Sequence, residues 1–135
     1  MRSLVPGLPA LLLCGCASNG LETLRPLEIM TGPYTSVVTA IPTGSLSYEH
    51  GCVLFSSDDG RLILAPMWPE GTVFNGTSVI FHKPGRAEQP IVVSQEVALA
   101  GQPLTWPAVP GPRAPLFERQ CGGVPFAVAE VRPAN

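Results

Sequence analysis

Residues 72–81 read TVFNGTSVIF. In this stretch Asn75-Gly76 stands between runs of β-branched and aromatic residues. Asn-Gly favours a type I′ turn because both residues tolerate a positive φ, and the twist of that turn matches the twist of two paired strands. The sequence therefore predicts a β-hairpin centred on Asn75-Gly76.

The segments before this hairpin continue the β pattern. Strands are expected over residues 45–50 and 52–56 with a bend between them, then a turn at Ser-Asp-Asp-Gly, residues 57–60, and a strand over 61–65. In the last of these strands, Leu62 and Leu64 alternate toward one side.

The segments after the hairpin predict two more strands and one short helix. A strand is expected to begin at Ile91, to run to Leu99 and to end at Gly101, and a last strand to cover residues 125–131. Residues 101–124 hold five prolines and have no hydrophobic period. Within them, Pro115 is expected to start a helix over residues 116–120.

Composition fits a small, turn-rich domain. The chain has 135 residues, of which 45% are hydrophobic and 13% charged, with 14 glycines and 16 prolines. This hydrophobicity argues against disorder, and so many helix breakers argue against long helices. A net charge of -2 offers no basic patch for nucleic acid. We therefore expect one all-β domain over residues 41–135: a small barrel or sandwich of about five to seven short antiparallel strands, OB-like, with one short helix before the last strand.

The N-terminus carries a signal of its own. An apolar run over residues 4–13 follows Arg2, and it ends in Leu13-Cys14-Gly15-Cys16. The run is too short to span a bilayer, which needs about 20 apolar residues. It resembles a bacterial lipoprotein signal, in which an aliphatic residue and a small residue precede the acylated cysteine.

The resemblance implies that residues 1–15 are removed and that Cys16 carries the lipid. Residues 16–40 hold Asn19-Gly20, Pro26 and Gly32-Pro33 between short apolar patches, which indicates a tether and lead-in. The protein would then be held in the cell envelope, facing the periplasm or exterior, and on the outer membrane if the source has two membranes. Two or three acyl chains give a stable anchor, at about 0.8 kcal/mol per buried methylene. The open alternative is a short apolar N-terminus with two buried cysteines.

Lipidation of Cys16 and removal of Cys14 would leave Cys52 and Cys121. Exported domains live in an oxidising compartment where such a pair forms a disulfide. The two positions lie 69 residues apart, and closing a loop of this length would stabilise the fold by about 4 kcal/mol. Buried free thiols or a thiolate metal site remain alternatives, although His50-x-Cys52 supplies only two ligands.

Residues 44–131 also resemble the small exported β-barrel domains carried by bacterial lipoproteins. The resemblance rests on the order of Gly51-Cys52-Val53, the Leu62-Ile63-Leu64 run, residues 68–72 (WPEGT), Cys121 and a final FAVAEV strand. It implies an OB-like barrel and no particular reaction.

Known catalytic motifs are missing from the sequence: it has no GxSxG, SxxK, HExxH, P-loop or dinucleotide fingerprint. His50 and His82 are possible bases near neutral pH, but each also fits a surface or strand-end position. Asp58-Asp59 fits a turn better than a pair of catalytic carboxylates, because adjacent strand residues face opposite sides. We expect no enzyme activity, no cofactor and no metal site.

Two Trp-Pro pairs are candidates for recognition. Trp68 lies near apolar residues and is expected in the core, whereas Trp106 lies in the proline-rich loop and could be buried or exposed. If a binding surface exists, we expect it at Leu104, Trp106 and Arg113.

These observations favour a lipid-anchored envelope protein whose β-barrel has a binding or structural role. Its partners would be the membrane, through the lipid, and an envelope protein or glycan, but not nucleic acid. The alternative is a periplasmic inhibitor or immunity-type lipoprotein that uses the long loop to block an exported enzyme.

Overall fold

The computed structural model describes residues 22–134. In this part of the chain, nine strands form two sheets and are joined by one α-helix and one short 3-10 helix. The elements are β2 (Thr31–Gly32), β3 (Thr43–Glu49), β4 (Cys52–Ser57), β5 (Ile63–Pro69), β6 (Val73–Phe74), β7 (Ser78–Phe81), β8 (Gln89–Val92), β9 (Glu96–Pro103), η2 (Trp106–Ala108), α2 (Ala114–Cys121) and β10 (Val124–Pro133).

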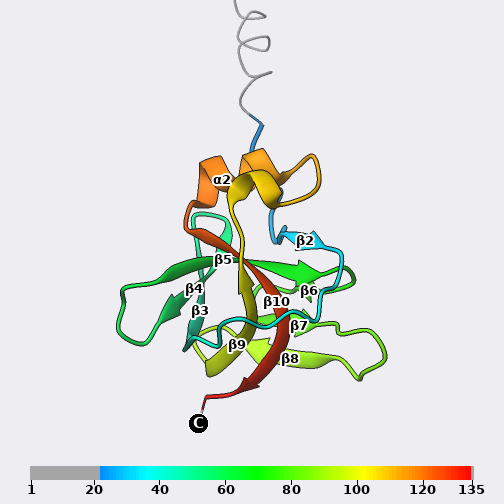
Figure 1. Ribbon diagram of the computed structural model, residues 1–135. Coiled ribbons are helices and arrows are strands. Elements are labelled where there is room, and N and C mark those ends of the chain that lie inside the picture. Colours follow the sequence, from blue (N-terminus) through cyan, green and yellow to red (C-terminus); the bar gives the residue numbers. More distant parts are fainter. Residues whose placement is uncertain (1–21, 135) are drawn as a thin grey trace, which may run out of the picture.

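Five strands close into a ring in the order β10-β9-β3-β4-β5, and β5 returns to β10. The β5–β10 pairing, Leu64–Met67 against Val124–Ala127, is parallel, whereas the other four pairings of the ring are antiparallel. Closure removes most free sheet edges. The expected mostly β, OB-like barrel is therefore confirmed (Figure 1).

A second sheet, β6-β7-β8, is inserted between β5 and β9. We call residues 73–92 the insertion. It has no independent core, because its apolar side chains belong to the barrel's own cluster, where the Phe81 ring packs edge-on against Trp68 with centroids 6.1 Å apart. The buried members of this cluster are Leu46, Val53, Phe55, Leu64, Trp68, Phe74, Val79, Phe81, Ile91, Val97, Leu99, Phe126, Val128 and Val131.

The hairpin predicted at residues 72–81 forms, with Phe74 opposite Val79. Its turn differs from the expected type I′, since only Gly76 has a positive φ, of 102°. The Asn75 carboxamide Oδ1 instead accepts hydrogen bonds from the backbone N–H groups of Thr77 and Ser78, at 2.9 and 2.8 Å. Asn75 therefore shapes this turn through its side chain and not through its backbone.

The two-residue turn with both φ values positive occurs earlier in the chain. His50 (φ 55°) and Gly51 (φ 78°) connect β3 to β4, and Glu49 pairs with Cys52 across them. This is the backbone signature of a type I′ turn. The tight turn fixes Cys52 at the very start of β4.

Three predicted strand boundaries are wrong. The expected strand over residues 91–99 is two strands, because Ser94 adopts a positive φ of 75° and the chain turns between β8 and β9. Gly101 lies inside β9 and does not end it. Leu62 precedes β5, which is buried on both faces along Leu64–Pro69 and so does not alternate.

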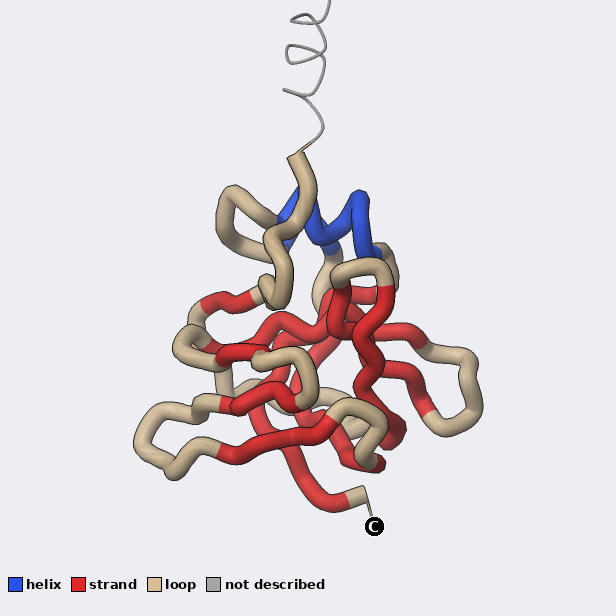
Figure 2. Tube along the Cα trace, turned by 180° about the vertical axis from the view of Figure 1, so that it is seen from behind, coloured by secondary structure: helices blue, strands red, loops and turns tan. Residues whose placement is uncertain are grey.

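The helix before the last strand is confirmed as α2, with Pro115 in its first turn. It packs with η2 at one end of the barrel, and the described chain begins beside it (Figures 1 and 2). β10 runs from this end to the opposite one, where the C-terminus lies (Figure 1). We call residues 104–123 the cap.

Candidate functional site

The cap is fastened to the barrel by a disulfide. Cys52 and Cys121 are joined, with their Cα atoms 5.7 Å apart. Beside the disulfide, Gln120 Nε2 donates to the carbonyl oxygen of His50 at 3.0 Å. The end of α2 is therefore tied to the β3–β4 turn by one covalent bond and one hydrogen bond.

Arg113 links the cap to the first described residues. Its Nε and Nη2 atoms donate to both carboxylate oxygens of Glu28, at 2.8 and 2.6 Å, and its Nη1 donates to Glu22 at 2.8 Å. The hydrogen-bonded guanidinium holds the pKa of Glu28 below its ordinary value. Leu24 is buried nearby, and its N–H donates to Gln120 at 3.0 Å. The chain thus lies on the cap from Glu22 onward.

Leu104, Trp106 and Arg113, where a binding surface was expected, are half-buried, and each makes contacts within the molecule. A second apolar cluster joins the cap to the barrel; its buried members are Leu24, Met30, Cys52, Ala65, Met67, Val109, Ala114, Leu116, Phe117 and Ala127. Leu104, Trp106 and Cys121 are partly buried and pack against this cluster. Trp106 Nε1 donates to the Gly123 carbonyl oxygen at 3.1 Å. Since Arg113 also pairs with two carboxylates, all three side chains help to hold the cap in place, and the binding surface expected there stays a prediction.

In OB-fold domains, the connections between the first and second strands and between the fourth and fifth strands border the ligand-binding face. The corresponding connections here are the His50-Gly51 turn and the cap. The Cys52–Cys121 disulfide joins them directly. This end of the barrel is therefore covered by the protein's own chain.

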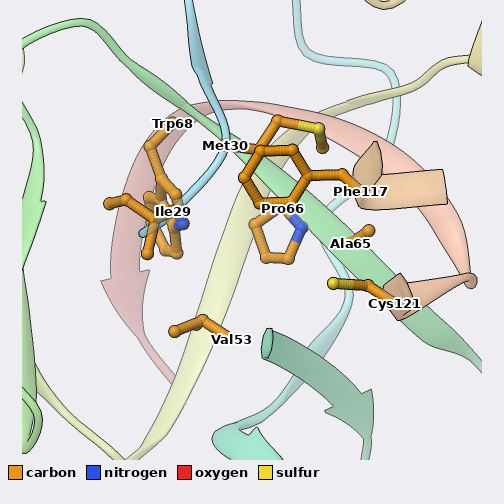
Figure 3. Close-up of a pocket in the computed structure, with 8 residues that line it drawn as sticks. All are labelled: Ile29, Met30, Val53, Ala65, Pro66, Trp68, Phe117 and Cys121. Atoms are coloured by element: carbon orange, nitrogen blue, oxygen red, sulfur yellow. The ribbon is translucent and has the colours of Figure 1, made fainter. Parts of the chain in front are cut away.

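Beneath the cap lies a cavity of about 10 Å3. Figure 3 shows Phe117 of α2 lying over Pro66, with Met30 beside them. Trp68 also lines the cavity, and its buried Nε1 has no hydrogen-bond partner among the described residues. The volume is at the lower limit for one water molecule, so the cavity cannot hold a larger ligand.

The two histidines lie on different elements of the fold and make different contacts. His50 forms the β3–β4 turn, where Cys52 Sγ lies 3.7 Å from its carbonyl oxygen. His82 follows β7, and its Nδ1 lies 3.8 Å from a Glu88 carboxylate oxygen. Within residues 22–134, no three His, Cys, Asp or Glu side chains are grouped to hold a metal ion.

The other candidate residues lie in a turn or in the core. Asp59 accepts a hydrogen bond from Ser57 Oγ, which lowers the Asp59 pKa, and another from the Arg61 N–H, as expected of a turn. Trp68 is buried in the core, as expected. Met30 and Met67 are both buried in the second apolar cluster.

A larger, open groove lies at the seam between the insertion and β10, and sequence reasoning missed it. Its volume is about 470 Å3, within the size range of small-ligand sites. We call it the basic groove, because three of its lining residues are cations and one is an anion. It is lined by Phe81, Lys83, Arg86, Ala87, Gln89, Glu130, Val131, Arg132 and Pro133.

Glu130 is held between two of these cations. Lys83 Nζ lies 2.8 Å from Glu130 Oε2, and Arg132 Nη2 lies 2.8 Å from Glu130 Oε1. The hydrogen bond from Lys83, and then that from Arg132, lower the Glu130 pKa to about 2. Arg86 forms no ion pair with any described residue, so the groove keeps an excess of positive charge in a chain of net charge -2.

Comparisons with protein-family models, with curated protein sequences and with solved structures find no match to this chain. Within residues 22–134, no helix is both long enough and apolar enough to cross a bilayer. The expected lipid site, Cys16, lies outside the described residues.

Proposed function

We propose that this chain is a lipid-anchored protein of the bacterial cell envelope, and that its OB-like barrel binds a partner without catalysis. The observation that carries the proposal is the Cys52–Cys121 disulfide. Disulfides persist in exported proteins and are rare in the bacterial cytosol. A disulfide in the folded domain agrees with an export signal ending in Leu13-Cys14-Gly15-Cys16.

The place where the chain meets the barrel supports an anchor at Cys16. Glu22 is bound to the cap by Arg113, and its carbonyl oxygen also accepts a hydrogen bond from Arg119. Six peptide steps separate Cys16 from Glu22, and a fully extended chain covers roughly 3.5 Å per step, or about 21 Å in all. A lipid on Cys16 would therefore keep the cap close to the bilayer.

Such an anchor directs the rest of the barrel away from the membrane. β10 ends at the side opposite the cap (Figure 1). The basic groove lies along Glu130–Pro133 of that strand. An anchored barrel would thus present this groove to partners in the surrounding compartment. This arrangement supports a binding role.

The inhibitor alternative depends on residues 101–124 acting as a free arm. In the structure these residues are held by the disulfide, by the Trp106–Gly123 hydrogen bond and by the Arg113–Glu28 ion pair. A fastened cap favours a role in closing the barrel over a role in reaching into an enzyme.

The experiment is to express the full chain in a bacterium and to measure partitioning between detergent and aqueous phases. We expect the wild-type protein in the detergent phase and Cys16→Ser in the aqueous phase, or in an unprocessed form. Cys14→Ser is the matched control: it removes a thiol two positions away and should partition as the wild type does. Detergent partitioning of Cys16→Ser equal to that of Cys14→Ser would refute the anchor.

A further inference from the structure

The basic groove lies where β10 loses its second neighbour. β10 pairs with β9 along Phe126–Pro133 but with β5 only along Val124–Ala127. Beyond Ala127, one edge of β10 has no strand partner among the described residues. An unpaired strand edge offers backbone donors and acceptors to another extended chain.

The backbone of Val131 points toward this open edge. Val131 lies opposite Leu99, whose N–H donates to the Pro42 carbonyl oxygen at 3.0 Å, on the side of β9 away from β10. Leu99 and Val131 are therefore a non-hydrogen-bonded pair of the antiparallel ladder, so the N–H and C=O groups of Val131 also point away from β9. Val131 itself lines the groove.

Cations surround this edge on two sides. Lys83 and Arg86 come from the insertion, and Arg132 comes from β10 itself. Glu130 is the single carboxylate among the residues that line the groove, and it pairs with both Lys83 and Arg132. The groove therefore keeps a net positive charge, with Arg86 outside these ion pairs. Pro133 is exposed and supplies apolar contact area, whereas Phe81 is buried and forms the floor of the groove.

We propose that the basic groove binds an extended acidic peptide segment of a partner protein, added as a strand along the free edge of β10. Val131 would hydrogen-bond the peptide backbone, and Arg86 and Arg132 would pair with its carboxylates. The inference deepens the binding role proposed above and names its partner class. It concerns a different part of the molecule from the anchor, so the two proposals can fail separately.

The test uses the full chain in neutral detergent and a fluorescent six-residue peptide of alternating Val and Glu. We expect saturable binding in fluorescence anisotropy, weakened about tenfold or more when Gln replaces Glu in the peptide, which corresponds to about 1.4 kcal/mol. A peptide N-methylated at alternate residues should also lose binding, because it cannot donate to the Val131 carbonyl. Equal affinity for the Glu and Gln peptides would overturn the proposal.

Variants locate the site. Arg86→Gln should weaken binding of the Glu peptide about three- to tenfold, because it removes an exposed charge without touching the Lys83–Glu130 pair. Arg61→Gln, which changes an exposed arginine at the β4–β5 turn, is the matched control and should bind as the wild type does. Equal affinities of these two variants would contradict the site. Amide shifts in NMR spectra should cluster at residues 81–89 and 130–133, and shifts elsewhere would contradict it as well.

Two further outcomes assign the groove to another occupant and overturn the proposal. Free glutamate that binds as tightly as the peptide would indicate a small-anion site. Self-association of the protein that Arg86→Gln abolishes would indicate a second copy of this chain. Cys16→Ser should bind the peptide with unchanged affinity, so loss of anchoring cannot be mistaken for loss of the groove.

Discussion

Single backbone positions decide whether the strands can approach closely enough to close the barrel. At Gly101 a Cβ atom would overlap the Ala127 carbonyl oxygen, and at Gly44 it would overlap the Ser56 carbonyl oxygen. Both obstacles are backbone atoms, which cannot rotate away. These two glycines are thus needed for space, whereas many of the others serve turns.

Gly101→Ala should lower the free energy of unfolding by about 2–3 kcal/mol, because the added methyl forces β9 and β10 apart. Gly60→Ala is the control: nothing lies within 4 Å of its added Cβ, and only its positive φ of 73° opposes the change. It should cost about 1 kcal/mol. Urea denaturation measures both values, and equal losses would contradict the close approach at Gly101.

At the scale of single residues, the sequence predicted the turns whose conformation depends on neighbouring residues alone. Asn75-Gly76 gave a hairpin because the signal is local, although the side chain of Asn75 took the role expected of its backbone. His50 and Ser94 adopt positive φ with no strong sequence signature, since such residues do so only when the surrounding fold requires it. The latter turn is the reason one expected strand became two.

At the scale of elements, α2 is a short helix that depends on its attachments. It has eight residues, and isolated helices of this length are marginal in water. Leu116 and Phe117 bury its inner face, and Cys121 bonds it to β4. The cap and the β3–β4 hairpin should therefore respond together to reduction of the disulfide.

Reduction, or the double change Cys52→Ala and Cys121→Ala, should lower the free energy of unfolding by about 4 kcal/mol, because the unfolded chain regains the freedom of a long loop. Urea denaturation with and without reductant measures the loss. The double variant is the control, since its midpoint should not depend on reductant. An unchanged wild-type midpoint under reduction would count against a stabilising disulfide.

The ion pair between the insertion and β10 predicts a pH dependence. The folded-state pKa of Glu130, about 2, lies below its ordinary value of 4.5. The stabilisation is thus fully present above pH 4.5 and is lost as the pH falls toward 2. Between these two values, Glu130 is protonated in the unfolded chain but still ionised in the folded one. Because the pair is partly exposed, we expect a contribution of only about 0.5–1 kcal/mol.

Glu130→Gln tests this directly. Its unfolding free energy should fall below that of the wild type above pH 4.5, and the difference should vanish near pH 2. Glu118→Gln, an exposed change on α2, should leave the pH profile unaltered. A difference between wild type and Glu130→Gln that does not vary with pH would disprove the ion-pair contribution.

The groove could not be predicted from the sequence for a reason that also belongs to this scale. Lys83 and Glu130 lie 47 positions apart and meet only because the insertion folds back onto β10. Lys83 is the chain's single lysine, but its position in the sequence does not indicate which carboxylate it pairs with. By contrast, the Cys52–Cys121 pair could be predicted, because these are the two cysteines that remain once Cys14 is assigned to the leader and Cys16 to the lipid.

For the whole molecule, the fold together with the proposed anchor would define a direction relative to the membrane. The cap, where the described chain begins, lies at one end, and the last residues of β10 lie at the other (Figures 1 and 2). A lipid on Cys16 would place the covered end toward the bilayer and the basic groove toward the surrounding compartment. The low charge and many breakers of the sequence agree with a barrel closed by short connections.

The most direct test is the mass of the N-terminal peptide of the full chain, isolated from membranes of a bacterium that expresses it. We predict that this peptide begins at Cys16, without residues 1–15, and carries a diacylglycerol on the thiol and an acyl chain on the amine. An N-terminal peptide that retains residues 1–15, or that begins at Cys16 without acyl groups, would contradict the proposed anchor.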